Sequence, residues 1–221
     1  IAANVMQVWD NTSGQLSTSN QSRLVLDLMA TDLESLVVQN ESDPWFQLEW
    51  ESSPFSGDLS LPGSAHLMFF SRVPQEGATQ IGSALSAVSY RIGYRDPFLN
   101  AENGEFPRFA LYRAILDPAN TFRHALESRT SLKTDIWDRN ETSPWDDLGS
   151  EGRSLSPRSW SLDVANLLAS HVVSMRCLFR YRDATGREQT VRLEEGGAQS
   201  LLLGRSLRVD GEILDYSQVQ S

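Results

Sequence analysis

The residues of this chain that could do chemistry are a group of carboxylates in one polar stretch, three histidines and a single cysteine. The polar stretch between residues 135 and 147 offers many hard oxygen atoms, and calcium binds six to eight such ligands. The candidate ligands are Asp135, Asp138, Asp146 and Asp147, with Asn140 and Glu141 between them. The spacing of an EF-hand is missing and Arg139 dilutes the charge, so a solvated acidic loop is the alternative to a calcium site.

The other chemistry-bearing residues lack the spacing that a catalytic site needs. The three histidines are single and far apart in sequence, without the HxxxH or HxH pattern of a zinc site: His66, His124 and His171. The Gly-Ser-Ala segments at 63–65 and 82–84 lack the second glycine of a nucleophile elbow. Gly196-Gly197 is not followed by the GK[ST] of a phosphate loop. Glu194 and Glu195 would need an apolar cleft for acid–base work. We therefore expect no enzymatic activity and no resident cofactor.

The elements that must position these residues begin with an amphipathic segment. Apolar residues recur at steps of three and four through the first 37 residues, which predicts a helix. Residues 11–22 are rich in Ser, Thr, Asn and Gln and offer few apolar contacts to a core. We expect the helix to project over 1–22 and to pack over 23–37. The packing residues should be Leu26, Met29, Leu33 and Leu36.

The remainder, 38–221, is predicted to be a β-rich body. Candidate strands are 45–50, 66–71, 85–95, 108–116, 171–182, 188–193 and 201–209. Two of them, 85–95 and 171–182, alternate between apolar and polar residues, as antiparallel strands with one buried face do. A turn is predicted at 183–186 and a short helix at 162–169. The fold class expected from this order is α+β, with a long N-terminal helix packed on antiparallel sheet.

Composition excludes some partners. The chain has 221 residues, 19 Lys+Arg against 29 Asp+Glu, and a formal net charge of −10. Without a block of basic residues, nucleic acid and anionic membrane surfaces are disfavoured. Cys177 is the only cysteine, so an intramolecular disulfide is excluded. The chain opens on Ile1 within an apolar stretch, from which we expect a processed or truncated N-terminus that has lost a signal peptide or a membrane anchor.

Three segments resemble bacterial type IV pilin-like proteins in their order along the chain. The segment 21–36, QSRLVLDLMATDLESL, looks like the second half of the first helix of prepilin-like proteins. VSYRI at 88–92 and FALYR at 109–113 resemble a strand pair of that family, and 167–181 resembles its turn into a long strand. The likeness is closest to the J-type minor pseudopilins of type II secretion.

This resemblance implies a non-catalytic subunit of a pilus or pseudopilus-type secretion or adhesion assembly. It implies a periplasmic location, with an inner-membrane anchor upstream of Ile1. Its partners would be other pilin-like subunits that contact the N-terminal helix. The apolar stripe predicted to make those contacts is Val5, Val8, Trp9 and Leu16.

A secreted binding module is the alternative hypothesis. Residues 128–161 form a surface excursion that is rich in polar residues yet holds three tryptophans, and flat indole rings stack on sugars. The candidate glycan-binding residues are Trp137, Trp145 and Trp160.

Overall fold

The structure, a computed structural model, describes residues 21–38, 44–51, 63–72, 85–96, 106–118, 121, 132, 164–194, 196–214 and 216–219. Within these residues the chain forms one helix of more than one turn, over 21–34, and eleven strands. The strands are β1 (Phe46–Glu51), β2 (Ser64–Ser71), β3 (Ser86–Arg95), β4 (Arg108–Leu116), β5 (Leu167–Ser170), β6 (Cys177–Asp183), β7 (Glu188–Leu193), β8 (Ser200–Leu203), β9 (Leu207–Val209), β10 (Glu212–Leu214) and β11 (Tyr216–Val219).

Eight strands form one antiparallel sheet in the order β10-β9-β8-β1-β2-β3-β4-β5, and three form a second sheet in the order β11-β6-β7. Every pair of neighbours in the large sheet is antiparallel, and most neighbours are consecutive in sequence. The exception is β8, which returns from the C-terminal part to pair with β1. Phe46 of β1 therefore lies opposite Phe69 of β2 on one side and Leu203 of β8 on the other.

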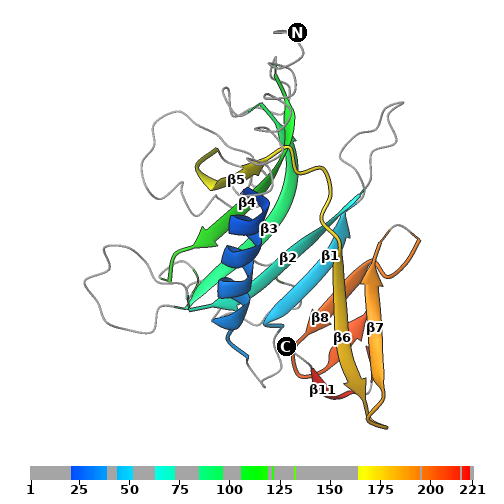
Figure 1. Cartoon of the computed structure of the whole chain (residues 1–221). Coiled ribbons are helices and arrows are strands. Elements are labelled where there is room, and N and C mark those ends of the chain that lie inside the picture. The colour runs from blue at the N-terminus through cyan, green and yellow to red at the C-terminus, as the bar shows by residue number, and fades with distance from the viewer. Residues whose placement is uncertain are drawn as a thin grey trace, which may run out of the picture.

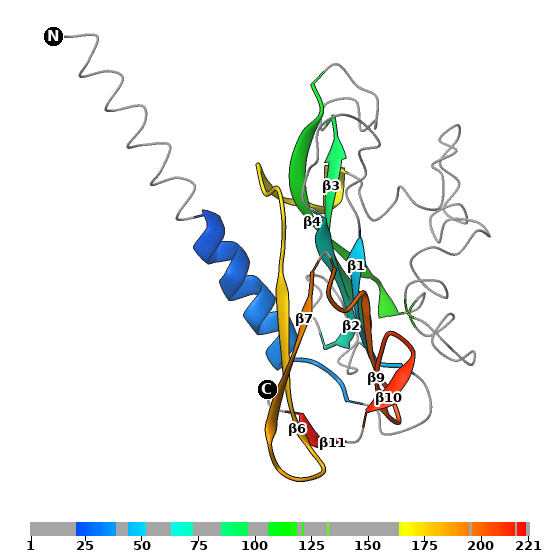
Figure 2. The same ribbon diagram turned by 90° about the vertical axis from the view of Figure 1, so that its right-hand side faces the viewer.

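The helix and the small sheet lie on the same face of the large sheet, as the two views show together (Figures 1 and 2). That face carries the main core, in which Phe46, Phe69 and Tyr90 of the large sheet are buried with Phe179 and Tyr181 of β6. The rings of Phe46 and Phe179 are 6.1 Å apart between centroids, so aromatic contacts join the two layers. The described molecule is a sheet-on-sheet structure with a helix beside the smaller sheet.

The prediction of an α+β fold with a long N-terminal helix packed on sheet is wrong. The described chain is mostly β-sheet, and its helix is short, ending at residue 34 before Leu36 bridges to Ser71. The apolar residues of the helix face different directions. Leu26 and Leu33, which we expected to pack, are 64% and 38% exposed, whereas Met29 and Leu36 contact the core as expected. A segment that is apolar almost all round does not reveal which side is covered, and here the sheet covers only one.

Five of the seven strand predictions are confirmed to within two residues, and 108–116 and 188–193 match β4 and β7. The strand predicted at 171–182 begins only at Cys177, and the run predicted at 201–209 is divided between β8 and β9. The helix predicted at 162–169 is wrong. Residues Val164–Asn166 make one turn of 3-10 helix, and Leu167 then enters β5, where Ala169 pairs with Leu111 of β4. A short apolar run of this kind is compatible with a strand as well as with a helix. Here it forms a strand because it pairs with the edge of β4.

The turn predicted at 183–186 is confirmed as the β6–β7 hairpin. The Asp183 carboxylate accepts hydrogen bonds from the backbone N–H of Thr185 and Arg187 and from the side chains of Thr185 and Gln189. These donors, Thr185 first, hold the pKa of Asp183 at about 2. Gly186 follows with φ of 81°, a backbone conformation that glycine adopts without strain.

Candidate functional site

The helix is attached to the sheet through a buried carboxylate. Asp32 is 4% exposed and receives two charge-assisted hydrogen bonds from Arg113 of β4, Nε to Oδ2 and Nη2 to Oδ1, both 2.8 Å long. The hydroxyl of Tyr90 on β3 donates to the same Oδ2. A bidentate arginine–carboxylate pair with a third donor fixes both distance and orientation. The polar cluster Asp32–Tyr90–Arg113 therefore fixes the helix on β3 and β4, together with the apolar contacts of Val25 and Met29.

The protonation states of this cluster suit a permanent contact. Burial, and after it the hydrogen bond and charge of Asp32, raise the pKa of the Tyr90 phenol above its ordinary value, so its hydroxyl remains a donor. Burial lowers the pKa of the Arg113 guanidinium, but its interactions with Asp32 and Tyr90, the Asp32 hydrogen bond first, outweigh it, and the net shift is upward. Tyr90 and Arg113 therefore both remain hydrogen-bond donors to Asp32, and the cluster is a structural contact.

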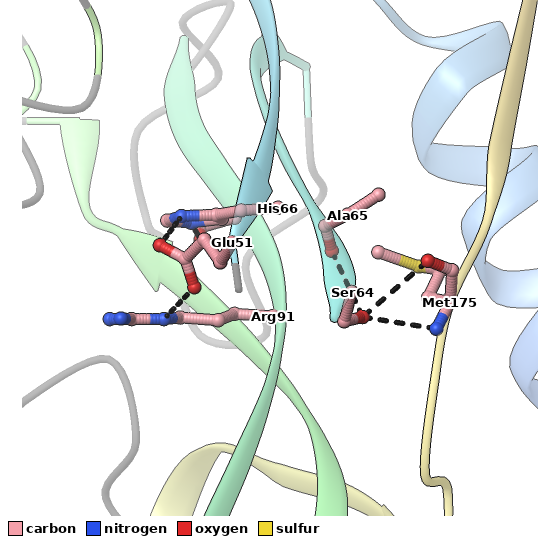
Figure 3. Close-up of polar contacts among 7 residues, drawn as sticks. Glu51, Ser64, Ala65, His66, Arg91 and Met175 are labelled. Atoms are coloured by element: carbon pink, nitrogen blue, oxygen red, sulfur yellow. Dashed lines mark hydrogen bonds and ion pairs between the residues drawn. The ribbon is translucent and has the colours of Figure 1, made fainter. Parts of the chain in front are cut away.

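A second polar cluster crosses the first three strands of the large sheet (Figure 3). His66 of β2 lies with Nε2 2.7 Å from the Ser89 hydroxyl of β3 and Nδ1 3.2 Å from the Glu51 carboxylate of β1. Arg91 of β3 donates from Nε to the other oxygen of Glu51 at 2.9 Å. Serine, histidine and carboxylate in this order are the arrangement that activates a serine nucleophile.

The second cluster is buried, which limits the access of solvent and substrate to it. His66 is 0% exposed and Ser89 1%, so neither the hydroxyl nor the imidazole meets solvent, and a substrate could not reach them without opening the sheet. Only Glu51 and Arg91 come partly to the surface. The hydrogen bonds satisfy polar atoms that would otherwise be buried without partners, and they tie β1, β2 and β3 together.

The segment between β5 and β6 is joined to β2 by its backbone. Met175 donates its N–H to Ser64 Oγ at 3.0 Å (Figure 3). Its carbonyl accepts from the N–H of Ala65 at 2.8 Å, and Ser174 Oγ donates to the carbonyl of Gly63. The side chain of Met175 contacts the core beside Met29. These bonds place the start of β6 against the sheet, next to the helix.

The surface feature with the clearest capacity for binding is the outer side of the helix. Val25 and Asp32 of the helix are buried and Met29 is partly buried, while Leu24 is 70% and Leu26 64% exposed. Leu26 and Leu33 are seven residues apart and lie on the same side of the helix, whereas Leu24, two residues before Leu26, projects from the opposite flank. Exposed apolar side chains on one side of a helix mark a surface that is stabilised when another molecule covers it. We call Leu26 and Leu33, with the exposed Asp27 and Glu34, the outer helix face.

Most of the site residues predicted from sequence lie outside the described residues. These are the partner-contact residues Val5, Val8, Trp9 and Leu16, the calcium candidates Asp135, Asp138, Asp146 and Asp147, and the tryptophans Trp137, Trp145 and Trp160. Of the excursion 128–161 only Leu132 is described. It is buried, and its N–H donates to Gln47 Oε1. Among the described residues, no three His, Cys, Asp or Glu side chains gather as a metal site would require.

Sequence reasoning missed both polar clusters. For Asp32 a signal was present, because a carboxylate stood in the same helical stripe as Val25, Met29 and Leu36. A charge on a core stripe indicates a buried partner. For His66, Ser89 and Glu51 no signal existed in the spacing, since pairing of three strands brings them together.

Comparison of the chain with protein-family models, with curated proteins and with solved structures finds no match. In the described part of the chain, no helix has the length and apolarity needed to cross a membrane.

Cys177, which sequence alternation places on the apolar face of β6, is partly buried against the main core. Burial raises the pKa of its thiol from 9.0 to about 11. Because the thiolate is the reactive form, we expect a chromogenic disulfide reagent at pH 8 to label the native protein roughly a hundredfold more slowly than the denatured chain. Equal labelling rates for the native protein and for the chain in denaturant would show that the thiol is not held against the core.

Proposed function

We propose that this chain is a non-catalytic assembly subunit, of the kind represented by minor pseudopilins, that binds neighbouring pilin-like subunits through its N-terminal segment and the outer helix face. The observation that carries the proposal is the exposure of Leu26 and Leu33 on one side of a helix whose other side is held on the sheet by Asp32. Large apolar side chains left in water favour association by about 25 cal/mol for each Å² that a partner covers.

The helical period of the sequence supports a continuous contact surface. Val8 precedes Leu26 by 18 residues, about five turns of an α-helix, so the two share one angular position on a helical projection. The stripe that faces the core from Val25 to Leu36 does not continue upstream, where the corresponding positions hold Ser22, Thr18 and Asn11. The apolar pattern upstream therefore follows the outer side of the helix, which is the side that a partner would meet.

The resemblance of residues 21–36, 88–92, 109–113 and 167–181 to pilin-like proteins supports the class of partner. Under this proposal the subunit works outside the cytoplasm, held at the inner membrane by a segment upstream of Ile1. The alternative, a secreted glycan-binding module, rests on the sequence alone, because its candidate residues Trp137, Trp145 and Trp160 lie outside the described residues.

The proposal is tested by crosslinking the chain to the pilin-like subunits of its host, with wild type compared with Val8→Asp plus Trp9→Asp. We expect the crosslinked product to fall at least about tenfold, because two charges in an apolar helix contact leave buried carboxylates unpaired. The matched control, Asn4→Asp plus Asn11→Asp, adds the same charge at polar positions and should crosslink as wild type does. If Val8→Asp plus Trp9→Asp folds and crosslinks as well as wild type, the N-terminal segment is not the assembly surface. The binding-module hypothesis is then favoured over the assembly subunit.

A further inference from the structure

The small sheet turns an arginine-rich face away from the core. Along β6 the residues alternate, with Phe179 and Tyr181 buried and with Leu178, Arg180 and Arg182 exposed. Arg192 of β7 lies directly across from Leu178, so the two share that outer side. Arg176 stands two residues before Leu178 and is also exposed. We call this group, Arg176, Leu178, Arg180, Arg182 and Arg192, the arginine face.

The arginine face is unusual for this chain. Four of the 19 basic residues stand on it beside one of the 29 acidic residues, Glu188, so the rest of the chain is more acidic than the net charge of −10 indicates. Glu188 is 3.7 Å from Arg180, with both side chains at least half exposed, and such a pair contributes little. Arg176 and Arg192 make no ion pair within the described residues. Leu178, in the middle of the group, is 60% exposed.

The outer helix face has the opposite charge and the same apolar character. Leu26 and Leu33 are spaced by seven residues, and beside them Asp27 and Glu34 repeat that spacing, so a row of leucines runs next to a row of carboxylates. Arg23 lies one turn before Asp27, so the acidic part of the face is the stretch from Asp27 to Glu34. Neither carboxylate makes an ion pair in the part of the chain that the structure describes.

The two faces are complementary in charge, in apolar content and in dimension. Seven residues of helix place Asp27 and Glu34 about 10 Å apart, while four residues of extended chain place Arg176 and Arg180 about 13 Å apart. The long guanidinium arms can cover the difference, and arginine pairs with carboxylates in a bidentate fashion. Exposed leucines at the centre with arginines and carboxylates around them are typical of a protein interface that has an apolar core and a charged rim.

We infer that the arginine face of one copy of this chain receives the outer helix face of a second copy. This inference rests on the proposed role as an assembly subunit and names the surface that such a subunit presents to its neighbour. The helix and the small sheet that carry the two faces lie on the same side of the large sheet (Figure 2), and each copy offers one of each. The contact is heterologous, so each added copy leaves one helix face and one arginine face free, and copies can add one after another.

The test uses the full chain and two charge-reversed variants, with association measured by sedimentation velocity over a range of protein concentrations. The helix variant carries Asp27→Arg plus Glu34→Arg, and the face variant carries Arg180→Glu plus Arg192→Glu. We expect wild type to associate at roughly 50 mM salt and to dissociate at roughly 500 mM, because screening shortens the reach of the charges. Each variant alone should associate at least about tenfold more weakly than wild type, because like charges now oppose one another.

Mixing the two variants is the decisive measurement. Arginines on the helix of one variant then meet glutamates on the β6 and β7 strands of the other, while the remaining wild-type faces still match, so association should return to near the wild-type level. The control for the face variant is Arg205→Glu plus Arg208→Glu, which makes the same change in net charge as the face variant. Its two positions are exposed on the β8–β9 hairpin, so it should associate as wild type does.

A wild-type chain that stays monomeric at low salt would overturn the inference, as would variants that associate normally or a mixture that fails to recover. Circular dichroism on each variant separates these results from loss of folding. The crosslinking of Val8 and Trp9 variants to other pilin-like subunits has its own readout, so the proposed function can survive the failure of this contact.

Discussion

Replacing Asp32 with alanine is expected to lower the free energy of unfolding by about 3 to 5 kcal/mol. The variant leaves the Arg113 guanidinium, whose side chain is 17% exposed, without the carboxylate that its Nε and Nη2 groups contact. It also removes the acceptor of the Tyr90 hydroxyl, which is fully buried. Urea unfolding followed by circular dichroism measures the loss.

The same helix supplies a matched control. Asp27 is exposed one turn and a half before Asp32 and makes no ion pair among the described residues, so Asp27→Ala should change stability by no more than about 0.5 kcal/mol. Adding Arg113→Met to Asp32→Leu should recover part of the loss, because an apolar pair of similar volume needs no partner charge. If Asp32→Ala and Asp27→Ala cost the same, the carboxylate does not hold the helix on the sheet.

Phe69→Ala is expected to cost about 3 to 5 kcal/mol, because the cavity it leaves lies where the two layers meet. Phe69 is 1% exposed on β2 and stacks between Phe46 of β1 and Tyr90 of β3, at centroid distances of 6.4 Å from each. The loss should appear in thermal or urea unfolding as one cooperative shift, since the core cluster that contains Phe69 also contains Phe179 of the small sheet.

Phe106→Ala provides the comparison for this substitution, because Phe106 is 61% exposed just before β4. Its removal should change stability by no more than about 0.5 kcal/mol. A Phe69→Ala variant as stable as Phe106→Ala would contradict the placement of β2 at the centre of the core. Two separate unfolding transitions in Phe69→Ala would instead contradict a core shared by the two sheets.

The sequence predicted the strands well where its signal is local. Alternation in 171–182 predicts a buried face and a wet face, and β6 confirms both from Cys177 onward, with Phe179 inside and Arg180 outside. Over 171–176 the prediction is wrong, because these residues form no strand and Val173 is 43% exposed. In 85–95 the apolar face is buried as predicted, but Ser89 on the opposite face is buried as well, because His66 of the next strand covers it. The hairpin at 183–186 follows from turn chemistry carried by adjacent residues, so it could be predicted without knowledge of the rest.

The candidate site could be predicted only in part. The contact surface was predicted upstream, on an apolar stripe that lies outside the described residues, whereas Leu26 and Leu33, predicted to pack in the core, are exposed. Both are apolar, and only the location of the sheet decides which leucines it covers. The Glu51–His66–Ser89 cluster depends on the register of three strands, in which each shift by one residue would send a side chain to the other face.

The sequence by itself determined the β-rich body, the positions of most strands, the hairpin turn and the acidic charge, because each depends on residue type and near spacing. Tertiary structure alone decided that eight strands join in one sheet and that the helix ends at residue 34. It also decided that Asp32 meets Arg113 across 81 residues and that the arginines of β6 and β7 gather on one face. Pairing between distant segments is set by which surfaces bury together, and sequence spacing does not record it.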